Sequence, residues 1–111
     1  MKGTNIGEFE ELVMLTIASL VNDAYSVSIC DEIKRTTNRK VKHGVIHAVL
    51  NRLDEKGLLR STVGEATKVR GGKRKRYYHI TSAGKSALTR SKEWRDQLWS
   101  KIPDFIIKPA S

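Results

Sequence analysis

The stretch VKHGVIHAVLNRLDEKGLL, residues 41–59, contains the pattern that decides the fold. Four of its apolar residues stand at the i, i+3, i+4 and i+7 positions of one helix face. These residues are Ile46, Val49, Leu50 and Leu53. Gly57 follows at a place where helices commonly end. The spacing predicts a helix from about Lys42 to Lys56 that buries one stripe.

Two further helices are predicted upstream of this one. The nearer runs from about Tyr25 or Ser26 to Thr37, with Asn38 as its C-terminal stop. We expect its inward positions to be Val27, Cys30 and Ile33.

The first helix is predicted to start near Gly7–Glu8, where three glutamates suit the positive end of the helix dipole. From Phe9 to Val21 its apolar residues occupy every side. A helix that is apolar all round must be covered on more than one side. We therefore expect part of its cover to come from outside a single small domain.

After Gly57 the pattern changes to that of strands. Leu58–Val63 and Arg76–Ile80 flank a glycine-containing loop, which predicts a β-hairpin with a long basic tip. Alternation points Tyr77 and Tyr78 to opposite faces, so we expect one in the core and one exposed.

A last helix is predicted from a cap at Thr81 or Ser82 to about Ile102, before Pro103. At 100° per residue its apolar side chains fall within one broad arc. They are Ala87, Leu88, Trp94, Leu98, Trp99 and Ile102. We expect this arc to complement the over-apolar first helix across a two-fold axis. The tail after Pro103 receives no assignment.

Positive charge is concentrated in the second half of the chain. Residues 1–57 carry eight Lys/Arg and eight Asp/Glu, whereas residues 58–111 carry thirteen against four and so hold the whole net charge of +9. Six basic residues lie within nine positions, namely Lys68, Arg70, Lys73, Arg74, Lys75 and Arg76. Such a cluster is typical either of a polyanion partner or of a solvated basic loop, and charge alone favours neither.

The order of the elements favours the first alternative. Three helices followed by a basic hairpin form a winged helix-turn-helix, whose second motif helix enters the major groove of DNA. The predicted fold is mainly α with a small β-hairpin, and the chain divides into a DNA-binding domain, residues 1–80, and a C-terminal dimerisation helix with a short tail, residues 81–111. The six clustered cations would hold phosphates, while His43, His47 and Asn51 have the reach to read base edges.

The quoted stretch, followed by RGGKRKRYYHITSAGKSAL at residues 70–88, resembles the PadR family of bacterial regulators. The opening GEFEELVMLTIASLVNDAYSVSICDEI, residues 7–33, is similar to the family's short members. The resemblance covers about positions 7–100, and the wing that ends in Tyr-Tyr-x-Ile-Thr-x-x-Gly is its most specific part together with the helix before it.

This resemblance implies a dimeric winged-helix repressor that a small aromatic or apolar effector releases from its operator. It places the DNA-facing start of the recognition helix at Lys42, His43, Gly44, His47 and Ala48, with Arg52 one turn further on. It also places the wing tip at Gly71, Gly72, Lys73 and Arg74, and makes Tyr78 the anchor of the returning strand. The family usually has Tyr at the position of His47, a change that the fold tolerates easily but that leaves the base preference of this helix open.

The tryptophans have two interpretations. Trp94, Leu98 and Trp99 form either the core of the dimer contact or an aromatic cage for an effector. We favour the dimer core because large aromatics dominate interface burial.

Other functions receive less support. His43 and His47 have the i, i+4 spacing of metal ligands but no evident third ligand, so we expect neither a metal site nor a cofactor. Neither a phosphate-loop pattern nor a nucleophile elbow is present, so we expect no enzyme. No stretch approaches the length of a membrane span, and we expect a cytoplasmic protein. The main rival is a winged helix that binds RNA or a protein partner without operator specificity.

Overall fold

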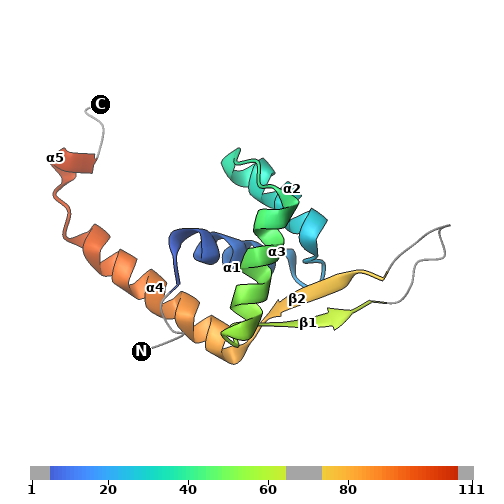
Figure 1. Cartoon of the computed structure of the whole chain (residues 1–111). Coiled ribbons are helices and arrows are strands. Elements are labelled where there is room, and N and C mark those ends of the chain that lie inside the picture. The colour runs from blue at the N-terminus through green and yellow to red at the C-terminus, as the bar shows by residue number, and fades with distance from the viewer. Residues whose placement is uncertain (1–5, 65–73, 108–111) are drawn as a thin grey trace.

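The computed structural model describes residues 6–64 and 74–107. Its elements follow one another along the chain as helices, a hairpin and helices again (Figure 1). They are α1 (Glu8–Leu20), α2 (Ser26–Thr37), α3 (His43–Glu55), β1 (Leu59–Val63), β2 (Arg76–Ile80), α4 (Ser82–Ser100) and α5 (Asp104–Ile107). The two strands pair antiparallel, with Leu59 opposite Ile80 and Val63 opposite Arg76. The predicted fold class, mainly helical with one hairpin and a C-terminal helix, is confirmed.

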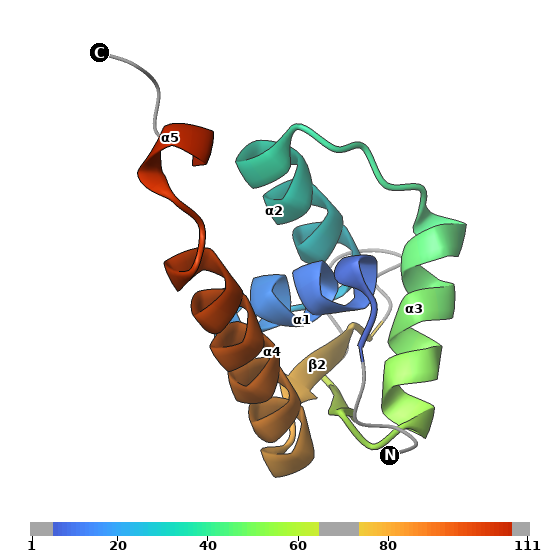
Figure 2. The same ribbon diagram turned by 90° about the vertical axis from the view of Figure 1, so that its left-hand side faces the viewer.

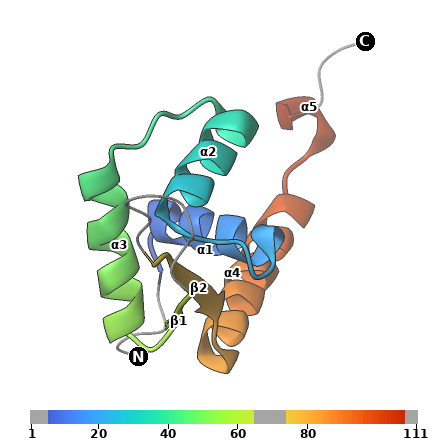
Figure 3. The ribbon, with the colours of Figure 1, turned by 90° about the vertical axis from the view of Figure 1, so that its right-hand side faces the viewer.

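Helix α1 lies at the centre of the molecule. Figures 2 and 3 show it between α3 on one side and α4 on the other, with α2 beside it. Val13, Met14 and Ile17 of α1 are buried against the stripe that the sequence predicted on α3. Leu15 and Ala18, by contrast, remain exposed on α1. The expectation that one domain leaves part of α1 uncovered therefore agrees with its burial pattern.

The face of α2 that packs into the core is rotated by part of a turn from the predicted one, so that part of the prediction is wrong. Val27 is exposed, whereas Ile29 and Ile33 are fully buried. Val27 and Ile29 lie about 200° apart around the helix, so both cannot face α1. The two longer isoleucines occupy the core, and Cys30 is only half-buried at the edge of their face.

The turn from α3 into the hairpin depends on two glycines. Gly57 adopts a φ of 76°, and the Leu58 N–H donates to the carbonyl of Leu53, as in a Schellman cap. A Cβ on Gly84, in the first turn of α4, would lie 2.3 Å from the Leu58 carbonyl oxygen. Thr81 caps α4 by accepting from the Gly84 N–H, and its hydroxyl donates to the Gly57 carbonyl. The Thr-x-x-Gly sequence thus fastens the start of α4 onto the turn after α3.

Beyond its first half, α4 leaves the body of the protein as an arm, on the side opposite the hairpin (Figure 1). Gly84 and Ala87 are buried, but the side chains of residues 92–100 are exposed. The radius of gyration is 16.7 Å, against about 13 Å for a compact chain of this length. Among the described helices none is both long and apolar enough to span a bilayer.

Candidate nucleic-acid interface

A groove of about 740 Å³ lies between the start of α2, the exposed side of α3 and the beginning of β2. Its lining includes apolar, acidic, basic and amide side chains. The lining residues are Tyr25, Ser26, Val27, His47, Asn51, Asp54, Arg74, Lys75, Arg76 and Tyr78. The structure therefore brings predicted base-reading residues and predicted phosphate-binding residues to one hollow.

Most of the α3 residues predicted to face DNA share the helix side opposite its buried stripe. Lys42 is the N-cap, and His43, Gly44, His47 and Asn51 are all exposed. A Cβ added at Gly44 would have no atom within 4 Å, so the chain offers a smooth surface at the start of α3. Such a surface allows close approach of another backbone.

Arg52 lies on the other flank of α3, towards α1. Its Nε donates to a carboxylate oxygen of Glu10 over 3.2 Å, and Lys56 donates to the same oxygen over 3.0 Å. The guanidinium of Arg52 is therefore engaged in holding α3 to α1, away from the groove of His47 and Asn51.

Aromatic contacts join the end of the hairpin farther from α3 and α4 to Tyr25, the N-cap of α2. The ammonium of Lys75 lies 4.2 Å from the ring centroid of Tyr25, and Tyr77 meets the same ring edge-on at 5.7 Å. The Tyr78 N–H donates to the Ala24 carbonyl, and its ring is buried. Burial raises the pKa of Tyr78, with Arg76 opposing and Asp54 adding to the shift. Tyr78 is thus the tyrosine in the core, as alternation predicted for one of the pair, but Tyr77 is half-buried against Tyr25 where alternation predicted an exposed side chain.

Three described cations lie at the start of β2 or just before it, and their surroundings differ. Lys75 stacks on Tyr25, and Arg76 donates to the hydroxyl of Ser61 over 3.0 Å. Arg74 is exposed and makes no hydrogen bond or ion pair to the residues of ranges 6–64 and 74–107. The other predicted wing residues, Lys68, Arg70, Gly71, Gly72 and Lys73, lie outside the described residues.

Asp54 is a groove residue that the sequence did not single out, and Val27, which was expected in the core, also lines the groove. Asp54 follows His47 by seven positions, which is almost two turns and places both on the same flank of α3. The helical periodicity that predicted the buried stripe could also have placed Asp54 on the flank of α3 that carries His47, because it assigns every residue of the helix to a side.

The titratable side chains near the motif do not form a larger cluster. The rings of His43 and His47 lie 6.5 Å apart, centroid to centroid. Within the described ranges, no group of three His, Cys, Asp or Glu residues is placed to hold a metal ion. Burial, with Asp31 nearby, raises the pKa of the Cys30 thiol, so less of the reactive thiolate is present at neutral pH.

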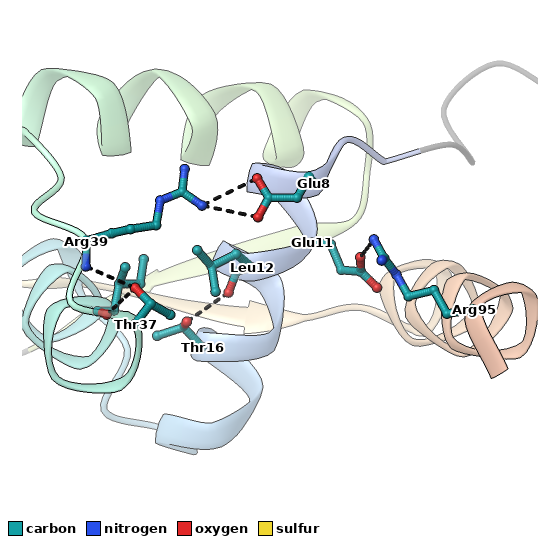
Figure 4. Close-up of polar contacts among 8 residues, drawn as sticks. Glu8, Glu11, Leu12, Thr16, Thr37, Arg39 and Arg95 are labelled. Atoms are coloured by element: carbon teal, nitrogen blue, oxygen red, sulfur yellow. Dashed lines mark hydrogen bonds and ion pairs between the residues drawn. The ribbon is translucent and has the colours of Figure 1, made fainter. Parts of the chain in front are cut away.

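The three glutamates that begin α1 each reach a different part of the molecule. Glu8 accepts from Arg39, which precedes α3, and Glu11 accepts from Arg95 of α4, as Figure 4 shows. Glu10 accepts from Arg52 of α3 and from the Gly7 N–H. The first turn of α1 therefore connects the loop before α3, α3 itself and α4.

Glu10 has a lowered pKa despite its burial. Burial alone would raise the pKa of this carboxyl, but the Gly7 amide, Lys56 and Arg52 together lower it below the usual value. The folded state thus stabilises the ionised carboxylate of Glu10.

A second hollow, of about 400 Å³, lies between α4 and the segment before α1. Its lining combines apolar side chains with two arginines and a serine. The residues are Ile6, Ala87, Arg90, Ser91, Trp94, Arg95 and Leu98. Trp94 and Leu98 are 64% and 62% exposed, and Trp99, at 59%, lies outside this lining. All three predicted arm residues are therefore on the surface of the single chain.

Comparisons with known proteins agree with this architecture. Residues 14–90 match the model of the transcriptional regulator PadR-like family. An uncharacterized protein of Lysinibacillus sphaericus is 36% identical over a 93-residue alignment that covers 81% of each chain. A PadR family transcription regulator of Clostridium difficile is 25% identical, with a TM-score of 0.68 over 85% of this chain and 94% of the other.

A PadR-like transcription factor from Bacteroides fragilis is 26% identical, with a TM-score of 0.69 over 83% of this chain and 84% of the other. The family model spans well over half of the sequence and includes α3, both strands and the buried half of α4. The chain belongs to the PadR-like family of transcriptional regulators.

Proposed function

We propose that this regulator is a homodimeric repressor that acts in the cytoplasm, binds operator DNA through α3 and the wing, and is released by a small apolar or aromatic effector. The wing here means the hairpin of β1 and β2. The observation that carries the DNA-binding part is the groove that joins His47 and Asn51 of α3 to the basic start of β2.

The two sides of the groove suit different contacts, α3 to the bases and the start of β2 to the phosphates. Helix α3 is about 20 Å long, and its exposed side is narrow enough to enter a major groove. His43, His47 and Asn51 then face base edges. Arg74, Lys75 and Arg76 face the phosphates that border the same groove, and the predicted cations Lys68, Arg70 and Lys73 would extend this contact. Arg52, engaged by Glu10, is the least suited of the predicted residues to this task.

Asp54 adds a negative charge to the lining of the groove. A carboxylate repels phosphate and accepts hydrogen bonds from the amino group of cytosine. It would therefore turn the backbone towards Arg74 and leave a base pair beside Asp54.

The arm supports dimerisation. Its exposed tryptophans and Leu98 form an apolar surface that a single chain leaves in water, and Leu15 and Ala18 of α1 are exposed as well. Antiparallel pairing of two α4 helices would lay the free half of each arm along the body of the other copy. Both uncovered surfaces would then be buried by one two-fold operation.

The hollow beside Trp94 supports effector release. A ligand there would contact Ser91 and Arg95, which both donate to Glu11. Glu10, the preceding residue in α1, holds α3 through Arg52 and Lys56. A ligand that displaces Arg95 would thus act on the turn of α1 that positions the recognition helix.

DNA binding is tested by titrating the protein onto a duplex from its own promoter, a shuffled duplex and a single-stranded RNA at several salt concentrations. We expect tighter binding to the promoter at every salt concentration. Arg74→Ala/Lys75→Ala should weaken binding to all duplexes and reduce the slope of log K against log salt by about 0.9 for each phosphate that the variant no longer neutralises.

The matched control is Lys92→Ala/Lys101→Ala, which removes the same charge from the distal arm and should leave the slope unchanged. Equal affinity for all three nucleic acids would overturn the operator proposal and favour the RNA- or protein-binding alternative.

Effector binding is tested through tryptophan fluorescence, since Trp94 and Trp99 are the only two tryptophans. Flat aromatic compounds should quench the emission of the Trp99→Phe variant, which keeps Trp94, and should weaken promoter binding. If no compound changes either signal, the effector part of the proposal fails and the DNA-binding part stands.

A further inference from the structure

We infer that α5 of one copy docks into a pocket on the body of its dimer partner, so that each arm ends in the other subunit. This inference rests on the proposed dimer. It assigns a role to the residues after Pro103, for which the sequence offered none.

The segment to be docked is the apolar helix α5. Phe105 is 83% exposed, and Ile106 and Ile107 are 64% and 41% exposed. Three consecutive large apolar side chains in water are unusual for a chain that acts alone. Figure 1 shows α5 at the far end of the arm, away from the packed helices.

The receiving pocket lies at the other end of α4. It has a volume of about 420 Å³ and is formed where the end of α1 meets β2 and the start of α4. Its apolar walls come from Ile17, Ala18, Val21, Ile80 and Leu88. The pocket is open and largely apolar, and thus suits side chains of the size of Phe or Ile.

Antiparallel pairing brings these two features together. The exposed apolar residues of α4 are centred near position 96 or 97. If two α4 helices cross there, residues 104–107 of one copy lie opposite about residues 85–90 of the other. Lys85 and Leu88 in that range line the pocket. A parallel crossing would instead bring the two α5 segments together and leave both pockets and the exposed side of α1 uncovered.

The same chain cannot fill its own pocket. From Leu88 to the end of α4 the helix extends for about 18 Å, and α5 lies beyond that end. The occupant is therefore α5 of a second copy, and the two-fold axis creates two equivalent docking sites.

A disulfide tests the docking directly. In a Cys30→Ala background, which removes the native thiol, Ala18→Cys and Ile106→Cys are combined in the full-length chain. A disulfide needs Cα atoms within about 7 Å, so this pair can be linked only between copies. We expect mild oxidation to convert most of the protein to a covalent dimer. The controls are the two single-cysteine variants and the pair Thr62→Cys/Ile106→Cys, with its first cysteine on the wing, which should remain largely uncrosslinked.

Equilibrium sedimentation gives an independent readout. Phe105→Ser should weaken dimerisation about a hundredfold, since each of the two equivalent docking sites contributes about tenfold. Ala18→Glu, at the exposed edge of the pocket, should weaken it as well, and the double variant should bind little more weakly than the more affected single one.

The outcomes separate the two proposals. A dimer that neither crosslinks through positions 18 and 106 nor weakens in Phe105→Ser would overturn the docking of α5 and leave the α4 dimer in place. A wild-type protein that is monomeric at micromolar concentration would overturn the dimer and the docking together.

Discussion

Glu10 and Glu11 are neighbours in the sequence, yet their carboxylates serve different parts of the regulator. Glu10 binds cations at the C-terminal end of α3, and Glu11 binds a serine and an arginine of α4. Both are largely buried. The helix dipole explained why acidic residues begin α1, but their partners lie 42 to 84 positions away, and no local pattern could identify them.

Replacing Glu10 by Gln should destabilise the protein by about 1–3 kcal/mol at pH 7, because Arg52 and Lys56 lose their shared anion. The folded-state pKa of Glu10 is lowered, so this stabilisation is present above the unfolded-state pKa and is lost as the pH falls through the folded value. Urea unfolding should therefore show a large difference in unfolding free energy between the variant and wild type at pH 7, and a small difference near pH 3.

The control for this change is Glu8→Gln. The pair of Glu8 with Arg39 is exposed on both sides, so its loss should cost less than about 1 kcal/mol at either pH. An equal loss of unfolding free energy in the two variants would contradict the stabilising role assigned to Glu10.

Asn51 and Arg74 line the same groove but should affect binding differently. Asn51→Ala removes a side chain suited to adenine, so it should change which promoter base is preferred by about 1–3 kcal/mol at one position. Arg74→Ala should weaken all sites alike. Affinities for a panel of single-base promoter variants check this, and a uniform loss in Asn51→Ala would mean that its role is not base reading.

At the scale of elements, local periodicity was sufficient where one face is clearly apolar. The buried stripe of α3, both strands and the stop after Gly57 were predicted from residues within a few positions of one another. Helix α2 was harder, because Val27 and Ile29 are both apolar and only the position of α1 decides between them. The sequence also could not predict that Val27 would line the groove instead of the core.

The junction of α3, β1 and α4 should be intolerant of a single methyl group. Gly84→Ala would place a Cβ against the Leu58 carbonyl, which cannot move without disturbing Gly57 and the hairpin. We expect a loss of at least about 2 kcal/mol in unfolding free energy.

Gly44→Ala provides a matched control in another helix. No atom lies within 4 Å of the added Cβ there, so the variant should be as stable as wild type or more stable by up to about 1 kcal/mol. Thermal unfolding of both variants measures the difference. A Gly84→Ala protein of wild-type stability would show that α4 can shift on the hairpin.

At the scale of the whole molecule, the single chain leaves three large apolar side chains of the distal half of α4 exposed, namely Trp94, Leu98 and Trp99. The sequence predicted this apolar surface from the width of the apolar arc. It could not predict that only the distal half of α4 would be free, since that depends on how far the body extends beside it.

Leu98→Asp should separate the proposed dimer. The substitution places a charge in the middle of the paired arms, so the dissociation constant should rise at least about a hundredfold while the fold remains. Thr89→Asp, on the outer side of α4, is the matched control and should remain dimeric. Light scattering and circular dichroism check assembly and folding, and a dimeric Leu98→Asp protein would place the interface elsewhere.

The arm can also be considered as a lever. Helix α4 is about 28 Å long and is fastened at one end, by the Thr81 cap and the close approach of Gly84, to the same turn that follows the recognition helix. A small tilt of a long helix becomes a large displacement at its tip. A small force applied at the tip likewise exerts a large torque on the fastened end. In the proposed dimer, a ligand or partner that holds the free end of α4 would therefore change the spacing of the two α3 helices without touching either of them.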